Sequence, residues 1–185
     1  MWGDFCTHCG AALSGHFPKK CTNGHWTYLS PVAVGVALQP VLKDGKTGLL
    51  GVQRNIPPFK GDYALPGGFA ENEDTPPETA ARELFEETGV VQKSEEAKYF
   101  TSFAGESHND ADARRHTVNF FSMPALPFDA VDWTRSDHEV IRLAFIELSP
   151  DGNGLVIEGT ETILCFPSHD DAAIGFLQQF KEGDF

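Results

Sequence analysis

Residues 68 to 90 read Gly-Phe-Ala-Glu-Asn-Glu-Asp-Thr-Pro-Pro-Glu-Thr-Ala-Ala-Arg-Glu-Leu-Phe-Glu-Glu-Thr-Gly-Val, and this stretch decides the fold. It predicts a helix that starts after Thr75 and stops at Gly89. Thr75 is a typical N-cap residue, Glu78 completes a capping box with it, and glycine commonly follows the last helical turn. The helical period places an apolar stripe on one side of this helix, and we expect it to be buried: Ala81, Leu84 and Phe85.

Three carboxylates gather on another side of the same predicted helix. Glu83, Glu86 and Glu87 fall within about 100° of one another at the helical repeat. Like charges at this spacing repel, and the last turn of a helix disfavours anions, although Arg82 can pair with Glu86. Clustered carboxylate oxygens suit Mg²⁺ or Mn²⁺. The helix alone favours a metal site and a solvated acidic face about equally.

The spacing of these residues resembles a known family. Gly68, Arg82-Glu83-Leu84, Glu86-Glu87 and Gly89-Val90 stand at the positions of the box that defines the Nudix hydrolases. Residues 61–68, which lead into the box, also resemble the segment that precedes the box in that family. One position departs from the pattern, because the first glutamate of the box is Asp74 here. Aspartate keeps the charge and shortens the reach.

The resemblance implies an α/β fold, the Nudix α/β/α sandwich with a mixed sheet. It also implies hydrolysis of a diphosphate with Mg²⁺ or Mn²⁺. Glu83, Glu86 and Glu87 resemble the metal ligands, and Arg82 resembles the residue that orients Glu83. Two glycines are expected to let the backbone turn tightly beside the phosphates through their freedom at positive φ. The residues expected near the substrate are Gly67, Gly68 and, less strongly, Glu71.

The general base is expected outside the box. Glu139, in Ser136-Asp137-His138-Glu139-Val140, stands just ahead of a predicted strand. Acidic residues in a comparable late loop serve as base or extra ligand in some relatives. A carboxylate there can take a proton from the attacking water. The alternative, a surface loop residue without a catalytic role, carries equal weight.

A second motif lies at the N-terminus. Cys6 and Cys9 are separated by two residues, and Cys21 is followed four residues later by His25. Two ligand pairs separated by a loop are typical of a zinc ribbon, here of the Cys3His type, with His8 and His16 as competing ligands. A disulfide is the alternative. No leader-like run begins the sequence, so we expect a reducing cytoplasm, which favours zinc.

An N-terminal zinc ribbon followed by a Nudix box resembles the arrangement in the Nudix subgroup that includes the NADH pyrophosphatases. The Ser-Gln-Pro-Trp-Pro-Phe-Pro run that marks those enzymes is absent, which counts against NADH. The proline that marks many ADP-ribose pyrophosphatases would fall near Gly105 and is also missing. Related enzymes are often dimers, so a homodimer is an expectation for which the sequence locates no interface.

Composition sets further limits. The 185 residues carry a formal net charge of −13, which argues against broad nucleic-acid binding. No apolar run approaches the length of a membrane span. We expect two domains, a zinc ribbon over residues 1–30 and a Nudix hydrolase domain over residues 31–185. Cys165 stands in an apolar run and is expected to be a buried small hydrophobe.

The remaining pattern predicts five strands and a last helix. The strands are expected at residues 32–38, 48–54, 98–103, 117–123 and 140–148. The helix is expected to begin near Ser168 as N-cap and to bury four residues: Ala173, Phe176, Leu177 and Phe180. The long polar stretch from Gly105 to Arg115 is expected to be a loop. Arg114 or Arg115 can grip a phosphate there, but solvated arginines are the favoured alternative. Phe59 and Tyr63 can stack on a base, but most aromatics in a chain with 15 Phe belong to the core.

Together these features predict a metal-dependent pyrophosphohydrolase. The expected substrate is a nucleoside diphosphate linked to another moiety, such as a dinucleotide (NADH) or an ADP-ribose-like nucleotide sugar, with release of a nucleoside monophosphate. The alternative is a non-catalytic nucleotide-sensing or partner-binding module that keeps the fold and works through the ribbon. An enzyme acting on capped RNA is a weaker rival because the chain is acidic.

Overall fold

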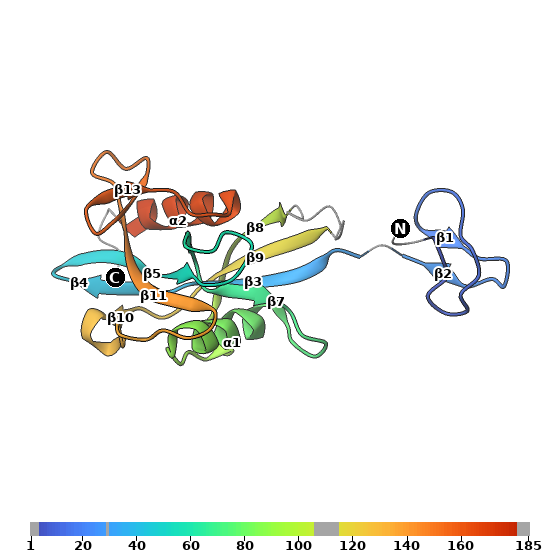
Figure 1. Ribbon diagram of the computed structural model, residues 1–185, viewed down its shortest axis with the longest axis horizontal. Helices are drawn as coiled ribbons and strands as arrows, with labels where there is room; N and C mark the ends of the chain where they lie inside the picture. Colours follow the sequence, from blue (N-terminus) through green and yellow to red (C-terminus); the bar gives the residue numbers. More distant parts are fainter. Residues whose placement is uncertain (1–3, 29, 106–114, 181–185) are drawn as a thin grey trace.

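The computed structural model describes residues 4–28, 30–105 and 115–180, without the side chain of Phe180. Arg114, one of the two arginines considered as phosphate contacts, therefore lies outside the described residues, as does most of the polar stretch around it. In the described part the chain forms a small N-terminal unit followed by a larger α/β domain (Figure 1). No helix of this part is long and apolar enough to cross a membrane.

The N-terminal unit lies at one end of the molecule, apart from the two large sheets (Figure 1). It contains a short antiparallel ladder of β1 (Lys19–Lys20) and β2 (Trp26–Thr27). Its buried side chains are few, namely Cys6, Leu13, Cys21 and Thr27. So small a core cannot hold a fold of this length without a crosslink or a metal.

The strands of the α/β domain divide between two sheets, each with parallel and antiparallel pairs. The smaller sheet has the order β7-β3-β9-β8. Its strands are β3 (Val32–Leu38), β7 (Gly67–Phe69), β8 (Lys98–Gly105) and β9 (His116–Ser122). The larger sheet has the order β10-β4-β5-β11-β12-β13, with β6 paired to β5. Its strands are β4 (Pro40–Lys43), β5 (Lys46–Arg54), β6 (Tyr63–Ala64), β10 (Leu126–Pro127), β11 (Val140–Leu148), β12 (Leu155–Ile157) and β13 (Thr160–Thr162).

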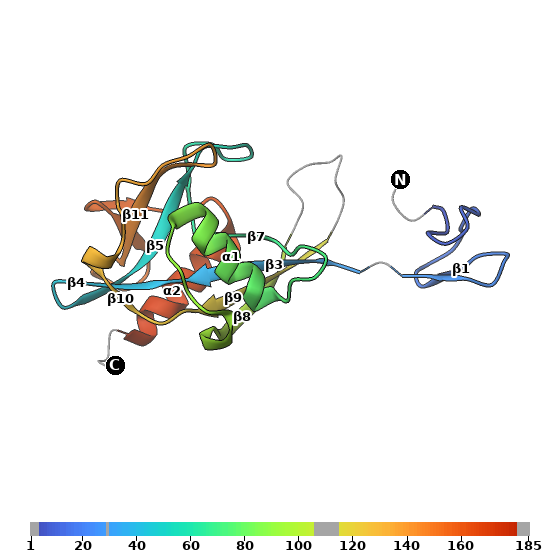
Figure 2. The ribbon, with the colours of Figure 1, turned by 90° about the horizontal axis from the view of Figure 1, so that it is seen from below.

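The box helix α1 (Pro76–Thr88) packs on one face of β3 (Figure 2). Gly35 makes this close approach possible. A Cβ atom at Gly35 would stand 2.3 Å from the carbonyl oxygen of Pro76 and 2.8 Å from Cβ of Thr79. Two short 3₁₀ turns, η1 (Ser94–Glu96) and η2 (Phe128–Ala130), lie in the connections that follow α1 and β10.

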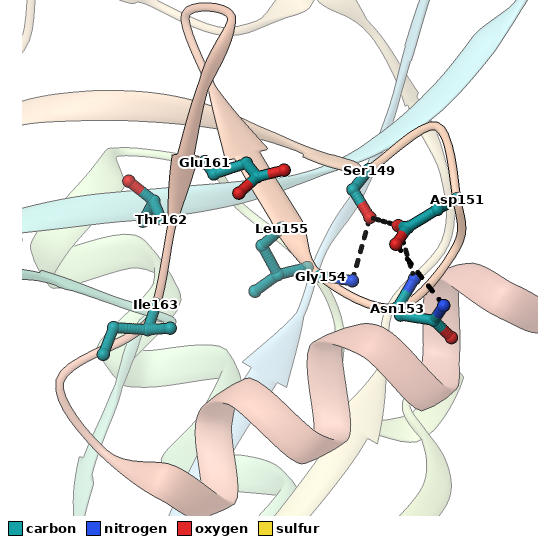
Figure 3. A pocket seen from close by; sticks show the side chains of 8 residues that line it. All are labelled: Ser149, Asp151, Asn153, Gly154, Leu155, Glu161, Thr162 and Ile163. Carbon is teal, nitrogen blue, oxygen red and sulfur yellow. Dashed lines mark hydrogen bonds between the residues drawn. The ribbon is translucent and has the colours of Figure 1, made fainter.

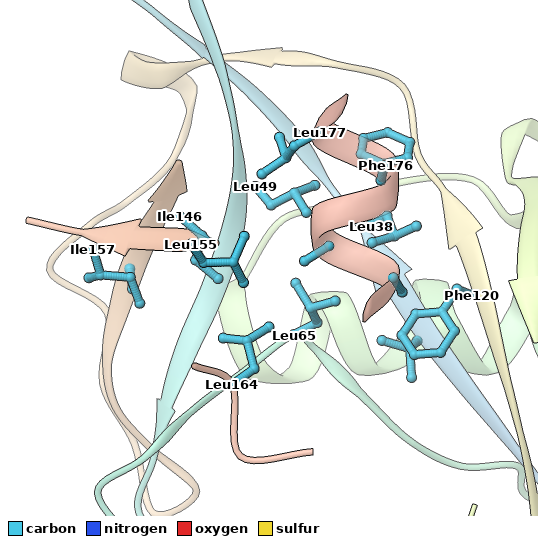
Figure 4. Close-up of a cluster of buried hydrophobic side chains, with 14 of the residues drawn as sticks. Leu38, Leu49, Leu65, Phe120, Ile146, Leu155, Ile157, Leu164, Phe176 and Leu177 are labelled. Carbon is cyan, nitrogen blue, oxygen red and sulfur yellow. The ribbon is translucent and has the colours of Figure 1, made fainter. Parts of the chain in front are cut away.

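The second helix, α2 (Pro167–Phe180), covers the opposite side of the core (Figure 4). Phe176 and Leu177 pack with Leu38, Leu49 and Phe120 in one buried cluster to which α2 and both sheets contribute. The helix begins one residue before the predicted N-cap Ser168, because proline is well suited to the first helical position. Ala173, Phe176 and Leu177 are buried as predicted.

Most predicted strands agree with the structure within two residues. The structure differs from the expectation mainly in the number of sheets. One mixed sheet between helices was expected, and the strands of the α/β domain form two mixed sheets. The chain passes from β3 in one sheet to β4 in the other at Gln39, whose buried amide donates to the carbonyl oxygens of Pro40 and Pro124. A strand that changes sheets is not visible in a hydrophobicity pattern.

Candidate functional site

The helix α1 is held at both ends by the residues that the sequence singles out. Thr75 is the N-cap, and the Glu78 carboxylate accepts from the Thr75 backbone N–H at 2.7 Å. Gly89 adopts the left-handed conformation with φ 76°, and its N–H donates to the Phe85 carbonyl at 2.8 Å. These caps fix the register of the helix and therefore which glutamates face the sheet.

The buried stripe of α1 is rotated from the predicted one. The buried residues are Thr79, Ala80, Leu84, Glu87 and Thr88. Ala81 is only half-buried, and Phe85 is 50% exposed, so the prediction for Phe85 is wrong. The contact through Gly35 turns the Thr79–Ala80 side of the helix towards the sheet. This rotation places Glu87 in the buried stripe, in line with Ala80 and Leu84.

Arg82 connects the box residues to one another. Its Nε donates to Asp74 Oδ2 at 3.0 Å, and its Nη1 donates to Glu83 and Glu86 at 2.9 Å each. Its Nη2 donates to the Phe69 carbonyl at 3.1 Å. The shorter Asp74 therefore still reaches the arginine. Arg82 in turn fixes the orientation of Glu83 relative to β7.

Glu83 and Glu87 lie in a poorly solvated environment. Burial, followed by the charge of Glu83, raises the pKa of Glu87 to about 8, against the lowering effect of the Gly67 N–H, which donates to Glu87 Oε2 at 3.1 Å. Burial also raises the pKa of Glu83, and Arg82 offsets this in part. The pKa values of both carboxylates are raised although Arg82 contacts Glu83, and a bound divalent cation would favour their ionised forms.

Glu139 approaches the same carboxylates from a different segment. Its charge makes a small contribution to the raised pKa values of both Glu83 and Glu87, after burial and the larger effects of other groups. Its backbone is fixed, because its N–H donates to Asp137 Oδ1 at 2.8 Å and its carbonyl accepts from Asn55 N at 2.7 Å. The loop that carries Glu139 also contacts α1, because Arg135 Nη2 donates to the Glu86 carbonyl at 2.8 Å.

Two predicted site residues stand further out. The Glu86 side chain is 54% exposed and is turned towards Arg82. Glu71 is exposed, and its backbone carbonyl accepts from Asp74 N at 3.1 Å. Among the described residues, the box carboxylates do not form a group of three with converging ligand atoms. Arg82 lies between Glu83 and Glu86, so three-carboxylate coordination would require the Arg82–Glu86 contact to open.

Gly67 and Gly68 serve the site through close packing. Neither has a positive φ, so the predicted tight turn is wrong, and both belong to β7. A Cβ atom at Gly68 would stand 2.3 Å from Glu83 Oε1, and one at Gly67 would stand 2.8 Å from the Gly35 carbonyl oxygen. The absence of side chains therefore lets Glu83 lie directly against the strand.

Comparison with known proteins agrees with this geometry. A family model of the NUDIX domain matches residues 31–154, about two thirds of the chain. The chain belongs to the NUDIX domain family. Its box, with Asp74 at the first acidic position, is therefore the Nudix box, and α1 is the Nudix helix.

Several relatives carry the same domain. The chain is 39% identical over 103 residues to the ADP-ribose pyrophosphatase of Methanocaldococcus jannaschii, with 55% of this chain and 54% of that protein covered. It thus spans about half the length of this curated relative. The fold is similar to a MutT/nudix family protein from Enterococcus faecalis (TM-score 0.63, 18% identity, 84% of this chain and 63% of that one). It is also similar to a NUDIX hydrolase from Nitrosomonas europaea (TM-score 0.59, 19% identity, 98% and 94% covered).

Outside the Nudix domain, the N-terminal cysteines converge. The ligand atoms of Cys6, Cys9, Cys21 and His25 all lie within 4.8 Å of one another. The Cys9 and Cys21 sulfur atoms are 3.8 Å apart, and His25 Nδ1 is 3.7 Å from Cys21 Sγ and 3.9 Å from Cys6 Sγ. A tetrahedron with Zn–S bonds of about 2.3 Å has edges of about 3.8 Å, so the spacing fits zinc, whereas bonded disulfide sulfurs lie about 2 Å apart.

The electrostatics of this cluster also suit a metal. Backbone hydrogen bonding at Ala11, then the Asn23 side chain, lower the pKa of Cys9 to about 7. The His25 backbone N–H lies 3.3 Å from Cys21 Sγ. Such donors stabilise thiolates, the form that binds zinc, although burial raises the pKa of Cys21 above the ordinary value of a thiol. His8 packs against the His25 ring at 4.4 Å between centroids and is not part of the converging group.

A separate hollow of about 380 Å³ lies between the turn at residues 149–154 and β13 (Figure 3). Its polar groups bond to one another: Ser149 Oγ donates to Asp151 at 2.5 Å and accepts from Gly154 N at 2.9 Å. None of the predicted site residues lines it. The box therefore remains the candidate active site.

Sequence reasoning missed one charged residue of the site. Arg54, the last residue of β5, lowers the pKa of Glu87, after larger contributions from burial, Glu83 and Gly67. Its guanidinium also lies 5.3 Å from the centre of the Phe166 ring. Arg54 pairs in register with Val140, next to Glu139. Only the strand pairing reveals this position, since nothing in the local sequence marks it.

Proposed function

We propose that this protein is a divalent-metal-dependent pyrophosphohydrolase. Its substrate is a nucleoside diphosphate linked to another moiety, and the products are a nucleoside monophosphate and the phosphorylated remainder. The observation that carries this proposal is the bonded network of the Nudix box, in which Arg82 donates to Asp74, Glu83 and Glu86, and the Gly67 N–H donates to Glu87. The loop that carries Glu139 contacts the same helix through the bond from Arg135 to the Glu86 carbonyl. Perturbed carboxylates that gather in this way are typical of catalytic sites.

Each residue of the site has a distinct part in the proposal. Glu83, Glu86 and Glu87 would hold Mg²⁺ or Mn²⁺, and Arg82 orients Glu83 through the bond described above. The bound metal would neutralise phosphate charge and stabilise the leaving group. Gly67 and Gly68 present backbone beside the phosphates, and Glu71 lies at the outer rim of the box.

Glu139 is proposed as the general base. It takes a proton from a water molecule as the water oxygen forms a bond to one phosphorus atom of the diphosphate. The bond from that phosphorus to the bridging oxygen then breaks, and the electron pair leaves with the other phosphate. Arg54 is placed to balance the negative charge of Glu87 and of the diphosphate.

ADP-ribose-like nucleotide sugars are the favoured substrate class, with dinucleotides such as NADH second. The curated relative is named ADP-ribose pyrophosphatase. The NUDIX domain of Shewanella oneidensis NrtR, similar in fold (TM-score 0.57, 19% identity), has a structure described as complexed with ADP ribose. These relatives support the ADP-ribose moiety as the first ligand to test.

We further propose that residues 1–30 form a zinc ribbon, held by one Zn²⁺ on Cys6, Cys9, Cys21 and His25, and that residues 31–185 form the hydrolase domain. The converging ligand atoms support the first statement. The cysteines are free thiols, which suits a reducing cytoplasm. The proposed ribbon has too small a core to fold alone, so its zinc is structural rather than catalytic.

A non-catalytic nucleotide sensor is the second candidate. Shewanella oneidensis NrtR, whose fold is similar over 81% of this chain (TM-score 0.53, 21% identity), also has a structure described as complexed with a 27mer DNA. Aspartate in place of the usual glutamate at position 74 would favour this candidate if it disrupted the hydrogen bonds of the box. The bond from Arg82 to Asp74 at 3.0 Å speaks against that, because the network around Glu83 is maintained.

The two candidates differ in turnover. The assay incubates the protein with ADP-ribose, NADH, FAD, diadenosine polyphosphates and nucleoside triphosphates, each with Mg²⁺ or Mn²⁺, and measures monophosphate release. We expect turnover that falls by about 100-fold or more in Glu87→Gln, which can keep the bond from Gly67 N but loses the charge. Glu161→Gln, at an exposed glutamate on β13, is the control. Ligand binding without turnover would support the sensor instead.

A further inference from the structure

Glu139, the proposed general base, lies in a loop, and groups carried by loops are held less precisely than groups on helices and strands. It stands directly before β11, and its side chain is 43% exposed. The neighbouring His138 has its Nε2 atom 3.4 Å from Glu139 Oε1, but the His138 side chain is 86% exposed and offers no rigid support. The position of the Glu139 carboxylate therefore depends on how its backbone is fixed.

Asp137 closes the loop around this backbone. Its Oδ1 atom accepts from the backbone N–H groups of Glu139 and Val140, at 2.8 Å each. Its own N–H donates to the Val140 carbonyl at 2.9 Å. An aspartate that accepts from backbone groups two and three residues ahead makes a compact turn in place of regular ladder bonds. Residues 137–140 are thus a closed turn that contains Glu139.

Asn55 ties this turn to the large sheet. It follows Arg54, the last residue of β5, which pairs in register with Val140. The backbone N–H of Asn55 donates to the Glu139 carbonyl at 2.7 Å, and its side-chain Nδ2 donates to the Asp137 carbonyl at 3.2 Å. Asn55 therefore continues the contact between β5 and the Glu139 segment beyond the end of the ladder.

The ladder alone does not fix this segment, because β11 is irregular at its start. Val140 and Arg142 pair with consecutive residues of β5, so Ile141 between them has no partner of its own. Val140 and Leu143 consequently pack in one buried cluster, although residues three apart face opposite sides of a regular strand. Bulges of this kind often lie beside active sites, where they change the direction of a side chain. The direction of Glu139 is thus left to the bonds of the turn.

We propose that Asn55 and Asp137 are positioning residues, which hold Glu139 in the orientation in which it takes the proton from the attacking water. This inference rests on the proposed function for the role of Glu139. Both residues act through Glu139 and need not touch the substrate. Their loss should therefore slow the chemical step and leave the affinity for the substrate nearly unchanged.

Steady-state kinetics of the full chain, with the best substrate of the panel and Mg²⁺, test the side chain of Asn55. We expect kcat of Asn55→Ala and Asn55→Asp to fall by about tenfold to 100-fold with KM changed by less than about twofold, because a shift of about 1 Å in a positioned group costs that much. Both variants lose the donor to Asp137, and aspartate keeps the size of the side chain. Alanine adds no charge, so a loss shared by the two variants belongs to the missing bond.

Asp137 allows a rescue by a conservative change. Asp137→Ala should lower kcat as much as Asn55→Ala does, whereas Asp137→Asn should keep most of it, since an amide oxygen can still accept from two N–H groups. An equal loss in Asp137→Asn and Asp137→Ala would overturn the role of the turn. Asp151→Ala is the matched control, because Asp151 Oδ1 also accepts from the backbone N–H two residues ahead, at 3.0 Å, in a turn away from the box.

A comparison in the Glu139→Gln background separates positioning from a general effect on stability. We expect Asn55→Ala to lower kcat there by less than about twofold, because the base whose position it controls is already lost. The same fractional loss in both backgrounds would overturn the inference. Melting temperatures identify the variants that are folded, and the two Asp137 variants carry the test if Asn55→Ala does not fold.

Failure of this inference can be distinguished from failure of the proposed function. Absence of turnover by the native protein with every substrate would overturn the proposed function, and this inference with it. Full activity of Glu139→Gln would remove the base and therefore its positioning residues. Full activity of Asn55→Ala and Asp137→Ala beside an impaired Glu139→Gln would overturn this inference alone.

Discussion

Gly68 lies directly against the carboxylate of Glu83, so that a Cβ atom added at Gly68 would stand 2.3 Å from Oε1 and 2.5 Å from Cδ. Replacing Gly68 by alanine must therefore displace Glu83 from its bond with Arg82. We expect kcat of Gly68→Ala to fall by about 100-fold, because a shift of about 1 Å in a positioned group costs that much. Steady-state kinetics with the best substrate of the panel measure it.

Gly175 provides the control for this substitution. It lies within α2, where an added Cβ would meet nothing closer than Phe100 Cζ at 4.0 Å. Gly175→Ala should keep full activity and raise the free energy of unfolding by up to about 1 kcal/mol, through helix propensity. Equal activity in the two variants would show that Glu83 does not need its present position.

Asp74 is expected to matter through Arg82. It accepts from Arg82 Nε, and both side chains of the pair are 24% exposed, so the loss of this partly exposed pair should cost about 1 kcal/mol of stability or less. Asp74→Ala should nevertheless lower kcat/KM several-fold, since Arg82 would lose one of the bonds that hold it against Glu83. Thermal melting and kinetics measured together separate the two effects. Glu73→Ala, at the neighbouring exposed acid, is the control, and an equal loss there would reject the role of Asp74.

The buried Glu87 predicts an unusual pH dependence. Its pKa is raised to about 8, so between the ordinary value of a glutamate and pH 8 the folded protein holds a proton that the unfolded chain has released. Stability must then fall as the pH rises through this range. Melting temperatures from pH 5 to 8.5, in buffers without Mg²⁺ or chelator, measure the fall. Glu87→Gln should flatten this part of the profile, and an unchanged slope would contradict the assignment.

Metal should reverse this trend. Mg²⁺ binds the ionised carboxylates, so the stabilisation gained on adding Mg²⁺ should increase as the pH rises towards 8.5. The same melts with and without the ion measure the difference. A gain that decreases with pH, or that survives in Glu87→Gln, would place the ion somewhere else on the protein.

The sequence is most informative where the signals are local. The caps at Thr75 and Gly89 fix α1, and the spacing of Arg82, Glu83, Glu86 and Glu87 resembles the Nudix box closely enough to predict the fold. The face of the helix that is buried could not be predicted in the same way. It depends on the contact with Gly35 in a distant strand, which turns Phe85 to solvent and Glu87 inwards.

Residues near the site that lie on strands could not be identified from the sequence. Arg54 belongs to the site because β5 pairs with β11 in a register that sets Arg54 opposite Val140. Phe69 faces away from the carboxylates because β7 pairs with β3. A shift of one residue in either register would reverse the face, and sequence patterning in so short a strand does not specify it.

Arg135 links the loop of Glu139 to the end of α1. Its Nη2 donates to the Glu86 carbonyl at 2.8 Å, and it lies against Gly89. We expect Arg135→Ala to lower kcat with little change in KM, because the loop that holds Glu139 loses this anchor. Arg135→Lys, which can still donate one bond, should recover part of the activity.

A double-substitution cycle tests whether Arg135 acts through Glu139. If it does, Arg135→Ala should reduce activity much less in a Glu139→Gln background than in the native one. Additive losses would show that Arg135 affects the site by another route, such as the stability of α1. Melting temperatures of all four proteins control for that stability effect.

The N-terminal cysteines predict one bound zinc per chain, with His25 and not His8 as the fourth ligand. Cys21→Ala and His25→Ala should lose most of the zinc measured by elemental analysis, whereas His8→Ala and Cys165→Ala should keep it. Cys165 serves as a control because it lies against the core cluster of the Nudix domain. Because residues 4–28 have so small a core, zinc loss should abolish order in this unit, visible as lost amide dispersion in NMR spectra. Full zinc content in His25→Ala together with loss in His8→Ala would exchange the two roles.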